Sequence, residues 1–123
     1  MNIAEWAVNA TERDIQNIAS RGLHMTCDEI REILARMGDS MSLRKLHRKI
    51  AIMAVILPLE EGETINNHQI LDEASRYVRN CSSITIDMVG AIMRIIEKWG
   101  YVDSHKNIAG GWPLTVYRRT ANV

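Results

Sequence analysis

Residues 84–100, ITIDMVGAIMRIIEKWG, are followed by residues 101–120, YVDSHKNIAGGWPLTVYRRT, and this pair of segments decides the fold. The first segment has apolar residues at helical spacing and stops at Gly100, which predicts a helix over 85–99. Beyond Gly100 the apolar period changes from 3.6 to 2, with β-branched and aromatic residues at 101–102 and 114–117. The intervening stretch 103–113 contains two glycines and a proline, so we expect a long hairpin connection with a polar tip.

Working outward toward the N-terminus, helix boundaries are marked by caps and glycines. Apolar residues from Ile3 to about Ser20 follow an imperfect helical stripe, which predicts one helix over this range. Thr26 is followed three residues later by Glu29, the pattern of a capping box, and so predicts a second helix start. Gly38 is expected to end that helix in a left-handed conformation.

The middle of the chain predicts three further elements before the final helix. A third helix is expected to start at Ser40 or Ser42 and to end at Pro58, with one apolar stripe and a cluster of cations near its start. Thr64 and Ile65 suit a short strand. Asn66 or Asn67 is expected to cap a fourth helix over 66–78, residues 81–83 to form a tight turn, and Ser83 or Thr85 to cap the helix over 85–99.

Composition limits the possible classes of protein. The chain has 123 residues, 46% apolar and 24% charged, which fits one domain with a possible appendage and is too apolar for a disordered chain. Fifteen Lys plus Arg balance fifteen Asp plus Glu. Because proteins with a surface committed to phosphate are typically basic, this neutrality leaves room only for a local basic patch.

Compartment is predicted from the cysteines and the apolar segments. Cys27 and Cys81 are far apart and form no CxxC unit, so we expect reduced thiols. The N-terminus lacks a basic segment followed by an apolar run, so no signal peptide is expected. The longest apolar stretch, 50–59, is too short for a membrane span, and we expect a cytoplasmic protein that does not bind membranes.

The motifs of common enzymes and cofactor sites are missing from the sequence. It contains no glycine-rich phosphate loop, no HExxH and no GxSxG, and its carboxylates do not form an isolated pair in apolar surroundings. The four histidines have no metal-ligand spacing; His24 and Cys27 are three residues apart but straddle a helix cap. We therefore expect neither an enzyme nor a bound metal or cofactor.

From residue 42 onward the expected order is helix, short extended piece, helix, turn, helix, strand, wing, strand. This order resembles the winged helix-turn-helix superfamily, in particular the small bacterial regulators of the MarR and related groups. The residues that carry the resemblance are the junction IIEKWGYV at 95–102 and the returning strand WPLTVYRRT at 112–120. The resemblance covers roughly residues 42–120, and residues 1–40 lie outside it.

The resemblance implies a mainly α fold with a small β-hairpin, in which a winged helix-turn-helix domain (41–123) follows an N-terminal helical extension (1–40). It implies a DNA-binding transcriptional regulator with helix 85–99 in the major groove and the wing, residues 103–113, near the adjacent minor groove or backbone. A homodimer is expected, because residues 1–40 show apolar stripes that need a partner. The expected DNA-contacting residues are Arg44, Lys45, Arg48, Ser83, Thr85, Arg94, His105, Lys106, Asn107, Arg118 and Arg119.

The residues themselves also support a second interpretation. On the predicted outward face of helix 85–99, Asp87 would repel phosphate, and Gly90 and Ala91 offer no hydrogen bonds to bases, which leaves Arg94 to read guanine. Charge runs such as 44–49 are also typical of a solvated helix face. The alternative hypothesis is therefore a winged-helix module that binds a protein partner, as a subunit or inhibitor in a larger assembly, with Trp112 as a possible anchor.

Overall fold

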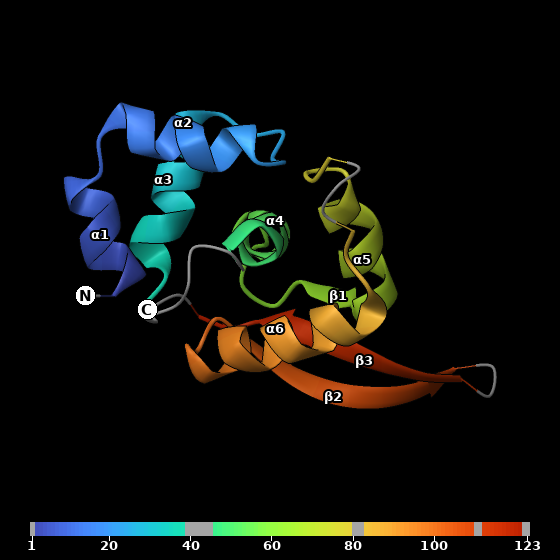
Figure 1. The fold of residues 1–123 in the computed structure, drawn as a ribbon. Coiled ribbons are helices and arrows are strands. Elements are labelled where there is room, and N and C mark those ends of the chain that lie inside the picture. Colours follow the sequence, from blue (N-terminus) through green and yellow to red (C-terminus); the bar gives the residue numbers. More distant parts are fainter. Residues whose placement is uncertain (1, 39–45, 80–82, 110–111, 122–123) are drawn as a thin grey trace.

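A computed structural model describes residues 2–38, 46–79, 83–109 and 112–121 of the chain. Within these ranges the protein is mainly helical, with a small three-stranded antiparallel sheet (Figure 1). The elements in chain order are α1 (Ile3–Asn9), α2 (Glu12–Ser20), α3 (Cys27–Arg36), α4 (Leu46–Ile56), β1 (Thr64–Asn66), α5 (Asn67–Ser75), α6 (Ile86–Lys98), β2 (Val102–Ala109) and β3 (Trp112–Arg119).

The segment predicted as one helix over 3–20 forms two helices. Ala10 leaves α1 in extended backbone, and Thr11 caps α2 through a capping box with Asp14. The Thr11 hydroxyl accepts from the Asp14 N–H at 3.2 Å, and the Asp14 carboxylate accepts from the Thr11 N–H at 3.0 Å. The single-helix prediction was wrong because this box satisfies the free N–H groups of a new helix start, and the T-x-x-D pattern is visible in the sequence.

The start of α3 is confirmed and its predicted end is not. Thr26 and Glu29 form the expected capping box. Met37 leaves the helix in extended backbone, at φ −75° and ψ 122°, so the chain needs no left-handed residue there. Among the described glycines the positive φ values belong to Gly22, Gly62 and Gly100, and the prediction of a left-handed Gly38 was wrong.

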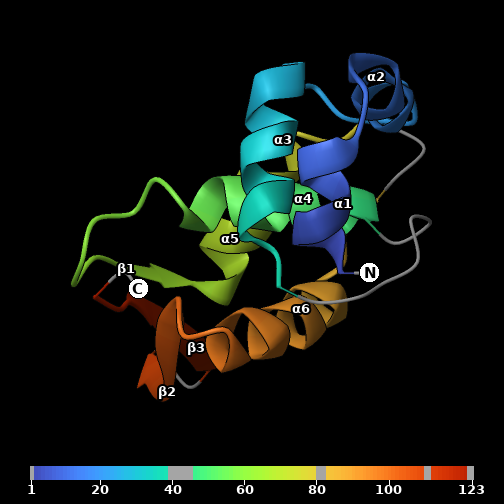
Figure 2. The ribbon, with the colours of Figure 1, turned by 90° about the vertical axis from the view of Figure 1, so that its left-hand side faces the viewer.

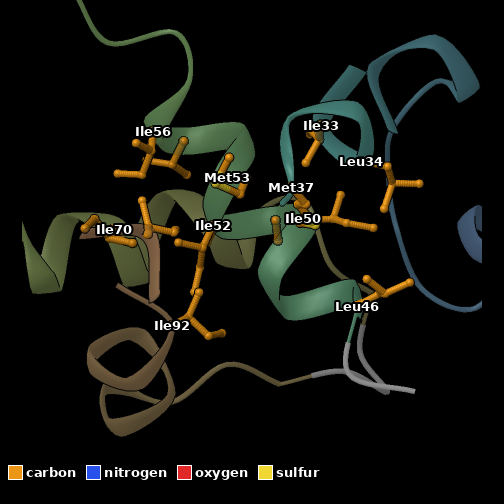
Figure 3. Packing of buried hydrophobic residues seen from close by; sticks show 14 of the residues in the cluster. Ile33, Leu34, Met37, Leu46, Ile50, Ile52, Met53, Ile56, Ile70 and Ile92 are labelled. Atoms are coloured by element: carbon orange, nitrogen blue, oxygen red, sulfur yellow. The ribbon is translucent and has the colours of Figure 1, made fainter. Parts of the chain in front are cut away.

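Helix α4 lies at the centre of the molecule. Its buried residues fall on more than the one predicted stripe, because Ala51, Ile52, Val55 and Ile56 are buried in addition to the predicted Leu46, Ile50 and Met53. Figure 2 shows α1–α3 on one side of α4 and α6 with the sheet on the other. In Figure 3, Ile52 points toward Ile92 of α6 while Ile50 points toward α3. A helix that is apolar on nearly all sides is expected to be covered on nearly all sides.

The N-terminal helices belong to the same core as the rest of the chain. Buried residues from α1, α2 and α3 join those of α4, α5, α6 and the sheet in one cluster. Backbone groups also connect the two parts of the chain: the His24 N–H donates to the Tyr77 carbonyl at 2.8 Å, and the Arg79 N–H to the Gly22 carbonyl at 2.7 Å. The apolar stripes of residues 3–37 are therefore covered by the chain itself.

The sheet has the strand order β1-β3-β2, with every pair antiparallel. The short strand predicted at Thr64 and Ile65 is confirmed as β1, which pairs Ile65 with Tyr117. Asn66, rather than Asn67, caps α5, and the box is completed by Gln69. Gly100, at φ +85°, makes the turn from α6 into β2 that the sequence predicted.

The hairpin differs from the predicted long connection. Strands β2 and β3 pair continuously from Val102 with Arg119 to Ala109 with Trp112, and only residues 110–111 separate them. Figure 1 shows this hairpin extending past α5, away from the body of the protein. The prediction of a long connection was wrong because polar residues such as Asp103, Ser104 and Lys106 pair in a two-stranded hairpin that is partly exposed to solvent, and apolar periodicity does not reveal such strands.

Candidate nucleic-acid interface

The outward face of α6 has the composition that the sequence predicted. Asp87, Ala91 and Arg94 are exposed and Gly90 is half-buried, while Val89, Ile92, Met93 and Ile96 face the core. Arg94 lies close enough to Tyr117 to influence its titration. Burial and the Glu97 carboxylate raise the pKa of the Tyr117 phenol, and the Arg94 charge opposes that rise. Arg94 is thus the exposed cation at the middle of the α6 surface.

Two side chains that were predicted to contact DNA, Thr85 and Arg48, form hydrogen bonds at the start of α6. Thr85 caps the helix, and its hydroxyl accepts from the Met88 N–H at 3.3 Å. The Arg48 guanidinium donates through Nε to the Ser83 carbonyl at 3.1 Å. Arg48 therefore braces the segment before α6, whereas Ser83 and Thr85 are exposed beside the helix start.

Three predicted wing residues lie within a strand and on different faces of the hairpin. His105, Lys106 and Asn107 are in β2, opposite Val116, Thr115 and Leu114. Ser104 marks the face toward α6, because its hydroxyl donates to the Glu97 carboxylate at 2.8 Å. Since successive side chains alternate in a strand, Lys106 shares that face, and His105 and Asn107 lie on the other. The prediction that 103–113 is a long connection between strands, which includes these three residues, was wrong.

The two arginines at the end of β3 are already engaged. The Arg118 guanidinium donates to the Asp103 carboxylate at 2.7 Å and 3.3 Å across the sheet. Arg119 is only 4% exposed, and its Nη1 donates to the Tyr101 carbonyl at 3.0 Å. Its guanidinium carbon lies 5.1 Å from the centre of the Tyr101 ring, and its buried Nε has no hydrogen-bond partner among the described residues.

This placement corrects the prediction that Arg119 contacts DNA. Arg119 shares the inner face of the sheet with its register partner Val102 and with Tyr117, so it cannot reach a phosphate from this position. Arg118 is on the outer face, where Asp103 neutralises its charge. The side of the sheet on which each arginine lies follows from strand register, which the sequence did not reveal.

The Arg118 and Asp103 pair gives a prediction about titration. The hydrogen bonds and charge of Arg118 hold the pKa of the Asp103 carboxyl below its usual value. A lowered carboxyl pKa means that the pair stabilises the fold above the ordinary pKa of aspartate, and that this contribution is lost as the pH falls through the lowered value. In the Arg118→Ala variant we expect the pKa of Asp103, followed by NMR, to rise toward its usual value. An unchanged pKa would show that the pair does not persist in solution.

Two predicted contacts, Arg44 and Lys45, lie outside the described residues, as does Cys81. Cys27 is a free thiol. In the described ranges no group of three His, Cys, Asp or Glu side chains is placed to hold a metal ion. No helix in those ranges is long and apolar enough to cross a membrane.

The chain matches no family model, no curated protein and no solved structure.

Proposed function

We propose that residues 41–123 form a winged helix-turn-helix unit that binds duplex DNA and regulates transcription, with α6 in the major groove and the hairpin against the adjacent backbone. The order α4, β1, α5, α6, β2, β3 supports this proposal, because it is the order that the resemblance implies. The observation that carries the proposal is the hydrogen bond from the Ser104 hydroxyl to the Glu97 carboxylate. This bond connects α6 to the face of the hairpin on which Lys106 lies, so that α6 and Lys106 can contact the same duplex.

The structure narrows the set of side chains that this function would use. Arg94 is the α6 residue able to form a two-pronged hydrogen bond with guanine, and Lys106 would bind phosphate from the hairpin. Ser83 and Thr85 would add contacts near the start of α6, and Arg44 and Lys45 stay predicted contacts. Arg119 is buried and supports the unit instead of contacting DNA, whereas Arg48 and Arg118 stay predicted contacts that also bond within the chain. Each cation that contacts a phosphate releases counterions from the DNA, so added salt would weaken binding.

A homodimer stays a prediction, but the reason for placing its interface in residues 1–40 no longer holds. The apolar side chains that suggested it, including Ile15, Ile30 and Leu34, are buried within the chain. A homodimer that places two α6 helices on adjacent half-sites would therefore use another surface.

The proposal is tested by titrating a fluorescent random-sequence duplex with the full chain at low salt. We expect a rise in anisotropy that is lost steeply as salt is added. The double variant Arg94→Ala/Lys106→Ala should bind about tenfold or more weakly, because it loses one exposed cation of α6 and one of the hairpin. The matched control is His105→Ala/Asn107→Ala, which alters the other face of the hairpin and should bind within about twofold of the parent.

The second candidate function is recognition of a protein partner by the same unit. It is favoured by the exposed Asp87 on α6 and by the neutralisation of Arg118, which both reduce the attraction for DNA. If the parent chain leaves the duplex unbound at low salt, DNA binding is excluded and this candidate takes its place. Equal affinities of the two double variants would exclude the interface proposed here even if DNA is bound.

A further inference from the structure

Strand β2 forms one edge of the sheet. The strand order is β1-β3-β2, so β2 pairs with β3 on one side and with no other strand of the described ranges on the other. Figures 1 and 2 show β2 at the margin of the molecule, and residues 104–107 of the strand are exposed. A strand edge of this kind carries a row of backbone groups that can pair with a further strand.

The backbone groups that point away from β3 can be identified. The Thr120 N–H donates to the Tyr101 carbonyl at 3.0 Å, so the backbone of Tyr101 faces the β3 side of the hairpin. Because the direction of the N–H and C=O groups alternates along an antiparallel strand, residues 103, 105 and 107 also face β3. The N–H and C=O groups of Ser104 and Lys106 therefore point outward, and no backbone group of the described residues bonds to them.

The edge of β2 lacks two of the features that commonly protect a sheet edge from pairing, which are prolines and β-bulges. The strand contains no proline, and it pairs with β3 residue for residue from Val102 to Ala109. Its carboxylate and its ammonium group belong to Asp103 and Lys106. Asp103 is neutralised by Arg118 at 2.7 Å, so Lys106 is the charge that decides what can pair with this edge.

The Glu97 carboxylate lies beside the same edge, on the face that Lys106 shares. It accepts from the Ser104 hydroxyl at 2.8 Å, and Ser104 and Lys106 lie on one face of the strand because they are two residues apart. Within the described ranges neither Glu97 nor Lys106 forms an ion pair. The edge thus presents a negative group at Ser104 and a positive group at Lys106, a pattern that complements its own reverse.

We propose that β2 pairs antiparallel with β2 of a second copy of the chain, so that two sheets join into one. A two-fold axis through the sheet at His105 places Ser104 opposite Lys106 of the second copy, and Lys106 opposite its Ser104. The outward backbone groups of these residues then bond to each other across the axis. Directly opposite side chains have Cβ atoms about 5 Å apart, so each Lys106 can reach Glu97 of the other copy.

The neighbouring registers of this pairing fit less well. Moving one strand by two residues keeps the faces of the side chains and changes their partners. In one direction Lys106 comes opposite Lys106 of the second copy, where like charges repel. In the other direction it comes opposite Val102, whose side chain is 2% exposed and belongs to the core. The charges along β2 therefore favour one register, with a second copy as the occupant.

This inference goes beyond the proposed function and does not rest on it, although both use Lys106. In the joined sheet both α6 helices lie on the same face, because Ser104 marks the face toward α6 in each copy. An exposed ion pair contributes little, so main-chain bonds hold the dimer, and Lys106 can exchange Glu97 of the other copy for a phosphate. The experiments contain no DNA, so a failure here leaves duplex binding untouched.

The association is measured by sedimentation equilibrium of the full chain. We expect the mass to rise from that of the 14.0 kDa monomer toward twice this value as the protein concentration increases from about 1 µM to about 500 µM. Hydrogen exchange by NMR locates the interface, because the Ser104 and Lys106 amides should exchange more slowly as the dimer forms. A monomer at every concentration, or a dimer in which these two amides exchange as in the monomer, would overturn the proposal.

A charge exchange tests the register. Lys106→Glu places a carboxylate beside Glu97 of the other copy and should weaken the dimer about tenfold or more, whereas Lys106→Glu/Glu97→Lys should restore the parent's association. The matched control Arg13→Glu makes the same change of charge at an exposed position of α2 and should associate as the parent does. Amide spectra verify that each variant is folded. Equal association of Lys106→Glu and Arg13→Glu, or no recovery in the double variant, would contradict the proposed pairing.

Discussion

Replacing Ile52 with alanine is expected to lower the free energy of unfolding by about 2–5 kcal/mol. Ile52 is fully buried at the centre of α4 and points toward Ile92 of α6 in Figure 3. The substitution removes three buried carbon atoms and leaves a cavity that the neighbouring helices cannot fill without moving. Denaturant unfolding measures the effect, and a lower midpoint with an unchanged slope indicates a loss of stability alone.

The control for this substitution is Val8→Ala. Val8 is 76% exposed on α1, so its truncation should change stability by less than about 0.5 kcal/mol. Because α4 is covered by α1–α3 on one side and by α6 on the other, Ile52→Ala should still unfold in one transition. Two separate transitions would mean that residues 2–38 and 46–121 fold as independent units.

Replacing Tyr101 with alanine is the second change expected to have a large effect, about 2–4 kcal/mol of lost stability. The Tyr101 hydroxyl donates to the Arg36 carbonyl at 3.1 Å and so connects the end of α3 to the start of the hairpin. Its ring covers the buried Arg119 guanidinium. Truncation exposes one face of that cation to a void and removes a contact between distant parts of the chain.

The matched variant Tyr101→Phe separates the two contributions of this side chain. It keeps the ring over Arg119 and removes the hydroxyl, so we expect a loss of about 1 kcal/mol. Thermal or denaturant unfolding of both variants provides the comparison. Equal losses in Phe and Ala variants would show that the hydrogen bond to Arg36, and not the ring, accounts for the stabilisation.

Local structure was predictable where it depends on residues close together in the sequence, as in a helix cap or a turn. Thr26 with Glu29 and Gly100 after α6 were identified from patterns of a few residues, and Asn66 was one of two predicted caps of α5. The helix break at Thr11 follows the same rule and was missed because the apolar stripe was given more weight than the cap. The outward face of α6 was also predictable, since helical spacing alone decides which side chains share a face.

The candidate site was predictable in its elements and less so in its residues. Arg94 is exposed on α6 as expected, because its position within the helix follows from the spacing. The sequence did not show which of Lys106, Arg118 and Arg119 lie on the inner face of the sheet and which on the outer face, because a shift of one residue in strand pairing exchanges the two faces. The pairing of Asp103 with Arg118 was hidden for the same reason, since the two residues are fifteen positions apart.

The sequence alone identified the cap of α3, the turn at Gly100 and the change from helical to strand period, and it limited the caps of α5 and α6 to two candidates each, because each feature depends on groups a few residues apart. The covering of α4 on both sides and the burial of Arg119 under Tyr101 depend on contacts between distant segments. So does the placement of His47 near Arg21. These outcomes depend on which surfaces meet when distant segments exclude water together, and no short stretch of sequence contains that information.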